Sequence, residues 1–222
     1  MPSCKGCVSS WRPGAGSVAE SVAPEYARFV AAQGRAAQAA MAEGRVAPGI
    51  FIGEAEAQKL LPIAARRASG LVRPTRRTEV IWVEGDSEIA VSLDALKLRF
   101  GEGLVIVTLT VRTDQTGAAP VLVHFACGSP GRPAGLYAAA QRRPKGPELI
   151  VTAWGDALVA FAWQCLIGLV TGVANATGKD QRGNLLVPVE MIATARGLEV
   201  LPMARHRFAG SSGLKPATPT RR

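Results

Sequence analysis

Residues 89–112 read IAVSLDALKLRFGEGLVIVTLTVR, and this stretch decides the fold class. Apolar residues occupy every second position on both sides of residues 101–103, as in the run Val105, Val107 and Leu109. A period of two is typical of strands that bury one face of a sheet and expose the other. The glycine-containing turn between the two runs therefore predicts an antiparallel hairpin.

The alternating pattern continues on both sides of this hairpin. A short apolar run, Val80–Val83, precedes it, and a run at residues 121–126 follows a turn at residues 114–117. Consecutive strands joined by short turns pair antiparallel. We therefore expect a meander of four or five strands between residues 78 and 127.

Two more strands are predicted nearer the C-terminus. They occupy residues 185–194 and 198–203, and Arg196-Gly197 forms a tight hairpin turn between them. Together with the meander, they predict one antiparallel sheet of about six to seven strands.

Residues 148–176 form the most apolar stretch of the chain, and residues 157–174 contain no charged side chain. This uncharged run reaches the minimum length of a membrane-spanning helix. A thin polar stripe made by Asp156, Gln164 and Thr171 recurs at helical spacing, which is typical of a helix packed on a core. We therefore expect one long apolar helix that covers the sheet, in preference to a membrane span.

The N-terminal part of the chain is predicted to be helical. Pro24 suits the first turn of a helix that runs to Met41 and ends near Gly44. A second helix around residues 54–69 is expected to be bent or interrupted by Pro62. The first helix has a mostly alanine surface, which buries little apolar area, so it needs a partner surface. The predicted fold class is α+β with an Ala-rich helical N-terminal arm.

Composition supports a globular body with extensions. The chain has 222 residues, of which 48% are hydrophobic and 19% are charged, which excludes a wholly disordered protein. The predicted organisation is a flexible lead at residues 1–16, a helical arm at 17–70, a basic linker at 71–78, an α+β core at 79–207 and a disordered basic tail at 208–222.

The N-terminus also bears on the compartment. Residues 1–16 are rich in Pro, Gly and Ser and lack the apolar region of a secretory signal, so a cytoplasmic location is expected. The four cysteines are then expected to be thiols or metal ligands and not a disulfide framework.

The formal net charge of +9 is concentrated in two segments. Residues 58–78 carry six bases and residues 201–222 carry five, in both cases without an acid, whereas residues 79–200 have twelve acids and ten bases. This asymmetry is typical of segments that contact anionic partners, although a solvated linker and tail would look the same. The candidate nucleic-acid or anion contacts are Arg66, Arg67, Arg73, Arg76 and Arg77.

Two cysteine-containing pairs suggest a metal site. Cys4 and Cys7 form a CxxC pair, and His124 and Cys127 have the same spacing. Four such ligands would suit a tetrahedral zinc ion. Positions three apart on a regular strand face opposite sides, so a turn would have to bring His124 and Cys127 together. We therefore expect no cofactor, with zinc as the alternative.

Other candidate sites are weak. Glu84, Asp86 and Glu88 cluster at a predicted strand turn, but their spacing matches no calcium loop and a solvated loop is favoured. The sequence contains no phosphate-binding glycine loop and no G-x-S-x-G motif, and it has only two histidines.

Three functional hypotheses remain. The first is a non-enzymatic assembly or adaptor protein that docks on protein partners, or on itself as a homo-oligomer, through its helical arm and basic segment. The second is a nucleic-acid-associated protein that uses the Arg66–Arg77 segment. The third is a small-molecule-binding or hydrolytic α+β domain in which Asp156, Gln164 and His124 line a pocket. A membrane partner is not expected.

Overall fold

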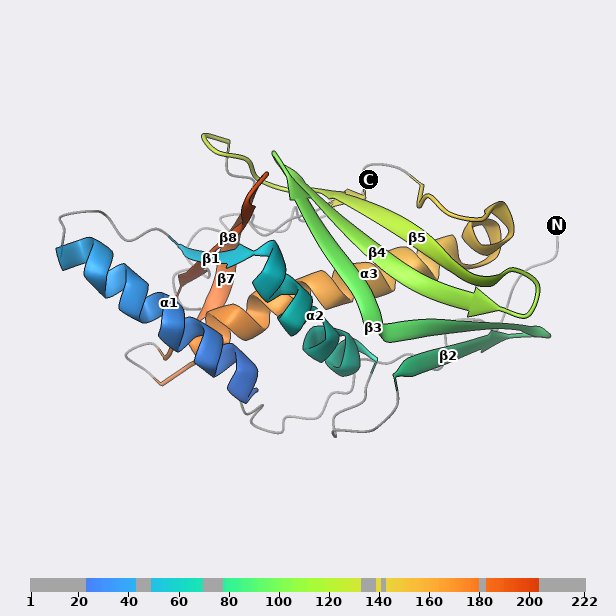
Figure 1. The fold of residues 1–222 in the computed structure, drawn as a ribbon, viewed down its shortest axis with the longest axis horizontal. Helices are drawn as coiled ribbons and strands as arrows, with labels where there is room; N and C mark the ends of the chain where they lie inside the picture. Colours follow the sequence, from blue (N-terminus) through green and yellow to red (C-terminus); the bar gives the residue numbers. More distant parts are fainter. Residues whose placement is uncertain are drawn as a thin grey trace, which may run out of the picture.

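The computed structural model describes residues 23–42, 49–69, 78–132, 139–140, 143–179 and 183–203. The predicted lead, the residues of the basic linker before Thr78 and the predicted tail lie outside the described residues, so the division of the chain stays a prediction. The fold is α+β, with three helices and two antiparallel sheets in the described part of the chain (Figure 1).

The larger sheet is the meander that the alternating pattern predicts. Its order is β2 (Glu79–Glu84), β3 (Ser87–Gly101), β4 (Leu104–Thr113), β5 (Gly117–Ala126) and the two-residue β6 (Ala139–Ala140). Each strand pairs antiparallel with the next.

Strand β3 is long and irregular. Its register against β4 shifts between Ser92 and Lys97, and Figure 1 shows the strand bending there. A β-bulge of this kind bends a strand and increases its twist. The hairpin of β2 and the first part of β3 therefore leans away from the rest of the sheet.

The expectation of one sheet with six to seven strands is wrong. Strands β7 (Val187–Thr194) and β8 (Gly197–Met203) form their predicted hairpin, but they pair with β1 (Ile50–Gly53) in a separate sheet of order β1-β8-β7. Strand β8 therefore pairs with β1, and not with a strand of the meander as expected. Gly197 makes this possible, because a Cβ there would overlap the carbonyl oxygen of Ile52.

The two sheets meet where β5 ends. The Ala193 N–H donates to the carbonyl of Gly128 (2.9 Å), and the Gly128 N–H donates to the carbonyl of Met191 (3.1 Å). The Gly103 N–H donates to the carbonyl of Ala193 (3.0 Å). These bonds hold one end of the larger sheet against β7.

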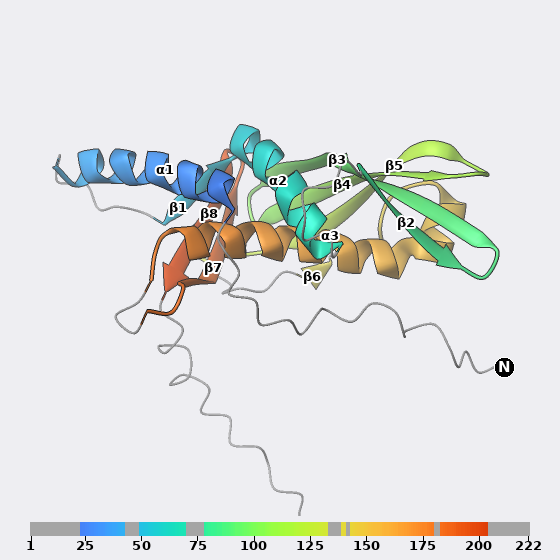
Figure 2. The ribbon, with the colours of Figure 1, turned by 90° about the horizontal axis from the view of Figure 1, so that it is seen from below.

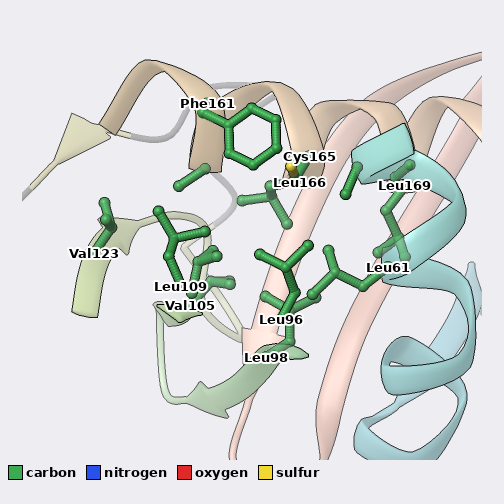
Figure 3. Close-up of a cluster of buried hydrophobic side chains, with 14 of the residues drawn as sticks. Leu61, Leu96, Leu98, Val105, Leu109, Val123, Phe161, Cys165, Leu166 and Leu169 are labelled. Carbon is green, nitrogen blue, oxygen red and sulfur yellow. The ribbon is translucent and has the colours of Figure 1, made fainter. Parts of the chain in front are cut away.

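Helix α3 (Glu148–Ala176) is the long apolar helix that the sequence predicts. It runs along the larger sheet toward the smaller one (Figures 1 and 2). Leu158, Leu166 and Leu169 are fully buried, and they belong to the same core cluster as the inner faces of both sheets. Figure 3 shows this core, in which side chains of α2, α3 and strands β3 to β5 meet.

Helix α2 (Glu54–Ala68) is continuous through Pro62, so the expected interruption is not observed. Its buried face, which includes Leu60, Leu61 and Ala64, joins the core cluster. The Gln58 side chain donates to the carbonyl of Leu98 on β3 (3.0 Å). The second part of the predicted arm is thus an integral layer of the body.

Helix α1 (Pro24–Ala42) is anchored by Tyr26, which is fully buried. The tyrosine ring occupies the space beside Gly172 of α3, where a Cβ would lie 2.7 Å from the ring Cζ. Its hydroxyl donates to the carbonyl of Leu60 (3.5 Å). Figure 2 shows the C-terminal half of α1 extending past the ends of α2 and α3.

Candidate functional site

The structure describes two of the five candidate arginines, and both have partners within the chain. The guanidinium of Arg66 pairs with the carboxylate of Asp94 in the β3 bulge region. The guanidinium of Arg67 lies 5.9 Å from the centroid of the Tyr26 ring, within the range of a cation–π contact. These two arginines therefore connect α2 to β3 and to α1.

The other three, Arg73, Arg76 and Arg77, lie outside the described residues. The structure therefore does not test whether the five guanidiniums gather on one surface. Their joint role as a nucleic-acid or anion contact stays a prediction.

The candidate zinc ligands are only half described, because Cys4 and Cys7 lie outside the described residues. His124 pairs with Ile106 in the β4–β5 ladder and alternates with Val123 and Phe125, which are buried in the core. His124 is therefore on the opposite face of the sheet, whereas Cys127 packs against the core. Among the described residues, no group of three or more potential ligands surrounds a common point.

The two described thiols lie in apolar surroundings. Burial raises the pKa of the Cys165 thiol in α3 well above its ordinary value of 9.0. Burial also raises the pKa of the Cys127 thiol, and a hydrogen bond from the backbone of Ala193 offsets part of that effect. Since the thiolate is the reactive form, neither thiol has the environment of an activated nucleophile.

A small open pocket of about 120 Å³ lies between the β2–β3 turn, the β4–β5 turn and the first turns of α3. One side is polar and carries carboxylates, and the other side is apolar and comes from α3. Its lining consists of Asp86, Ser87, Glu88, Thr113, Asp114, Gln115, Thr116, Leu149, Ile150, Ala153 and Trp154.

The pocket would suit a positively charged group with an apolar body, such as a lysine or arginine side chain with an apolar neighbour. Sequence reasoning identified Asp86 and Glu88 as part of an acidic cluster but missed Asp114, which comes from another turn. The sequence does carry one signal for this site, because Leu149 is a large apolar residue at the start of the predicted helix. In the structure the Leu149 side chain is 64% exposed.

The polar residues of the small-molecule hypothesis are not brought together in this pocket. Asp156 is exposed on α3, Gln164 lies two turns farther along the same helix, and His124 lies on β5. None of the three lines the pocket. The geometry therefore gives the third hypothesis no assembled site in the described part of the chain.

The other unusual surface is β2, the edge strand of the larger sheet. Ile81 and Val83 are 57% and 67% exposed, whereas Val80 and Trp82 pack against the core. The Trp82 ring lies 5.4 Å from the ring of Phe161, centroid to centroid, in an edge-on contact. One face of β2 is thus fixed to α3, and the other presents apolar side chains to solvent.

No family model matches the chain, and no match is found among curated proteins or solved structures.

Proposed function

We propose that this protein is a non-enzymatic assembly or adaptor protein that docks on protein partners or on copies of itself through its helical arm and basic segment. The placement of α1 carries the proposal. The helix has 19 residues, and at 1.5 Å per residue it is about 28 Å long. In its first turns, Tyr26 belongs to the core cluster, and Phe29 and Val30 pack against that cluster.

A helix on its own is marginal in water, because helix stability in proteins comes mostly from tertiary contacts. The C-terminal half of α1 extends past the body (Figure 2) and is rich in alanine, which permits close approach of another helix. A partner surface along this half would supply tertiary contacts of that kind.

The nucleic-acid hypothesis has less support. Arg66 and Arg67 are engaged with Asp94 and Tyr26, so a phosphate would have to compete with these contacts. Arginines that neutralise phosphates gain affinity by releasing the counterions that are condensed on the nucleic acid.

The test is native mass spectrometry of the full chain at two ionic strengths, with two charge-matched variants of α1. Ala36→Glu with Ala40→Glu places two carboxylates on one helical face, and Gln38→Glu with Ala42→Glu places two on the opposite face. We expect an oligomer or a partner complex that persists at high ionic strength and is lost in one of these variants only.

Two results together would contradict docking through the arm. The chain would be monomeric at all concentrations, and both variants would leave any complex with another protein unchanged. A monomer that releases nucleic acid as the salt concentration rises would favour the second hypothesis.

A further inference from the structure

The outer face of the larger sheet points away from α3, which packs on the opposite face (Figures 1 and 2). We propose that this outer face binds single-stranded nucleic acid, with Lys97, Arg99 and Lys145 contacting its phosphates. The face uses no residue of α1 and none of the Arg66–Arg77 segment. The inference therefore goes beyond docking through the arm, and its failure would leave that proposal in place.

Strand β3 supplies the cations of one margin. Leu98 is fully buried in the core, so Lys97 and Arg99 on either side of it point outward, and both are exposed. Two positions along a strand separate their Cα atoms by about 7 Å. Lys97 and Arg99 can therefore contact successive anionic groups of one ligand.

Lys145 supplies the cation of the other margin. Its N–H donates to the carbonyl of Leu122 on β5 (2.9 Å), and the Leu122 N–H donates to the carbonyl of Lys145 (2.8 Å). Directly paired residues share a face, and the neighbours of Leu122 along β5 are buried in the core, so both side chains point outward.

The two margins belong to one row of side chains across the sheet. With three spacings of about 4.8 Å between neighbouring backbones, the two lysine Cα atoms at its ends lie about 14 Å apart. The members of the row, in order, are Lys97, Thr108, Leu122 and Lys145. The adjacent row consists of Arg99, Ile106 and His124.

Neither row contains a carboxylate, and the three cations form no ion pair within the described residues. The two acids nearest to them along β3 and its turn are engaged elsewhere. Asp94 pairs with Arg66, and the carboxylate of Glu102 accepts a hydrogen bond from the Ala195 N–H (3.2 Å). An anionic ligand on this face would therefore meet attraction without a competing acid.

The surface between the margins decides the class of anion. It is made of half-buried side chains with apolar, hydroxyl or aromatic groups, namely Ile106, Thr108, Leu122 and His124. A matching ligand has regularly spaced anions and flat apolar units. In single-stranded nucleic acid, phosphates pair with basic side chains while unstacked bases lie on aromatic, apolar or guanidinium surfaces. A duplex keeps its bases stacked inside and offers only their edges in the grooves.

The test is fluorescence anisotropy of the full chain with a short labelled oligothymidylate at a series of salt concentrations. Each neutralised phosphate of a single strand contributes about 0.7 to the slope of log affinity against log salt. Replacing the three cations together, as Lys97→Gln, Arg99→Gln and Lys145→Gln, should therefore weaken binding at low salt and make the slope shallower by about 2.

A charge-matched triple variant is the control. Lys59→Gln, Arg112→Gln and Lys179→Gln remove the same side-chain types from exposed positions outside the two rows. Arg112 is on the same sheet but pairs with Glu79 (3.1 Å). The control should change the slope by less than the contribution of one phosphate. Equal losses in the two triple variants, or no binding by the unmodified chain at low salt, would overturn the proposal.

Three further probes distinguish a nucleic-acid strand from other polyanions. The unmodified chain should bind the oligothymidylate several-fold more tightly than an abasic sugar–phosphate chain of the same length, because base contacts add to the phosphate contacts. It should also prefer the oligothymidylate to duplex DNA and to polyglutamate as competitors. Equal binding of any of these three would overturn the assignment to single strands. Thermal melts followed by circular dichroism check that both triple variants are folded.

Discussion

Gly172 shows how one missing methyl group positions a whole helix. A Cβ at this position would lie 2.7–2.9 Å from three carbons of the Tyr26 ring, closer than real Cβ contacts. We expect Gly172→Ala to destabilise the protein by about 1–3 kcal/mol through overpacking. This cost exceeds the gain of about 1 kcal/mol that alanine gives in a helix interior. Urea unfolding measures the difference.

Gly168, one turn earlier on the same helix, is the matched control. A Cβ there would meet the Cβ of Ala64 at 3.5 Å, an ordinary contact. Gly168→Ala should therefore keep or raise the stability, by up to about 1 kcal/mol. Equal destabilisation by both variants would show that the Tyr26 contact is not the cause.

The free energy of unfolding is expected to vary with pH in the alkaline range, because the Cys165 thiol and the Tyr26 hydroxyl are buried in their neutral forms. Burial raises the pKa of the Cys165 thiol above 9.0 and that of the Tyr26 hydroxyl above 10.0, although Arg67 partly offsets the effect on Tyr26. Above these values the unfolded chain loses protons that the folded chain retains, so the free energy of unfolding falls as the pH rises.

We therefore expect stability to be constant near neutral pH and to decrease above about pH 9, as seen by urea unfolding at a series of pH values. Tyr26→Phe removes one of these titrating groups and should make the decrease above pH 10 shallower. A slope that the variant leaves unchanged would assign the decrease to other groups.

Among the elements, α2 is the one whose role the sequence did not show. Leu61 is fully buried in the core between α3 and β3 (Figure 3). We expect Leu61→Ala to cost about 2–5 kcal/mol in a single cooperative unfolding transition. Leu201→Ala, at a 40% exposed site, should change the stability by less than about 0.5 kcal/mol. Similar small losses in both would mean that α2 is peripheral to the core.

Sequence reasoning found the elements that have local signals. The alternation in β3 to β5, the proline at the start of α1 and the uncharged run of α3 are each visible within a short window. The confirmed bounds of α3, Glu148–Ala176, follow from such a local pattern.

The arrangement of those elements could not be predicted in the same way. The strand β1 has only four residues, IFIG, without alternation, and its partner β8 lies almost 150 residues later in the chain. Without β1, the hairpin of β7 and β8 had no visible partner except the meander. The pocket was missed for the same reason, because Asp114 and Leu149 approach Asp86 only in the folded chain.

For the whole molecule, the decisive element is α3, the one described helix that is long and apolar enough to cross a membrane. In the structure its buried residues belong to the core that both sheets share, and its exposed residues lie between positions 148 and 160. Ala157 is one of these exposed residues, whereas its neighbour Leu158 is fully buried. The two positions therefore distinguish a core helix from a membrane span.

We expect Ala157→Lys to change the free energy of unfolding by no more than about 0.5 kcal/mol, because its charge stays in water. Leu158→Lys should abolish folding, because it places an unpaired charge among the apolar side chains of the core. In a membrane span these two neighbouring positions would lie at nearly the same depth, so both charges would disturb insertion about equally. Detergent-free solubility and a cooperative melt for Ala157→Lys, with neither for Leu158→Lys, would establish α3 as the core of a soluble body; equal losses would favour a membrane protein.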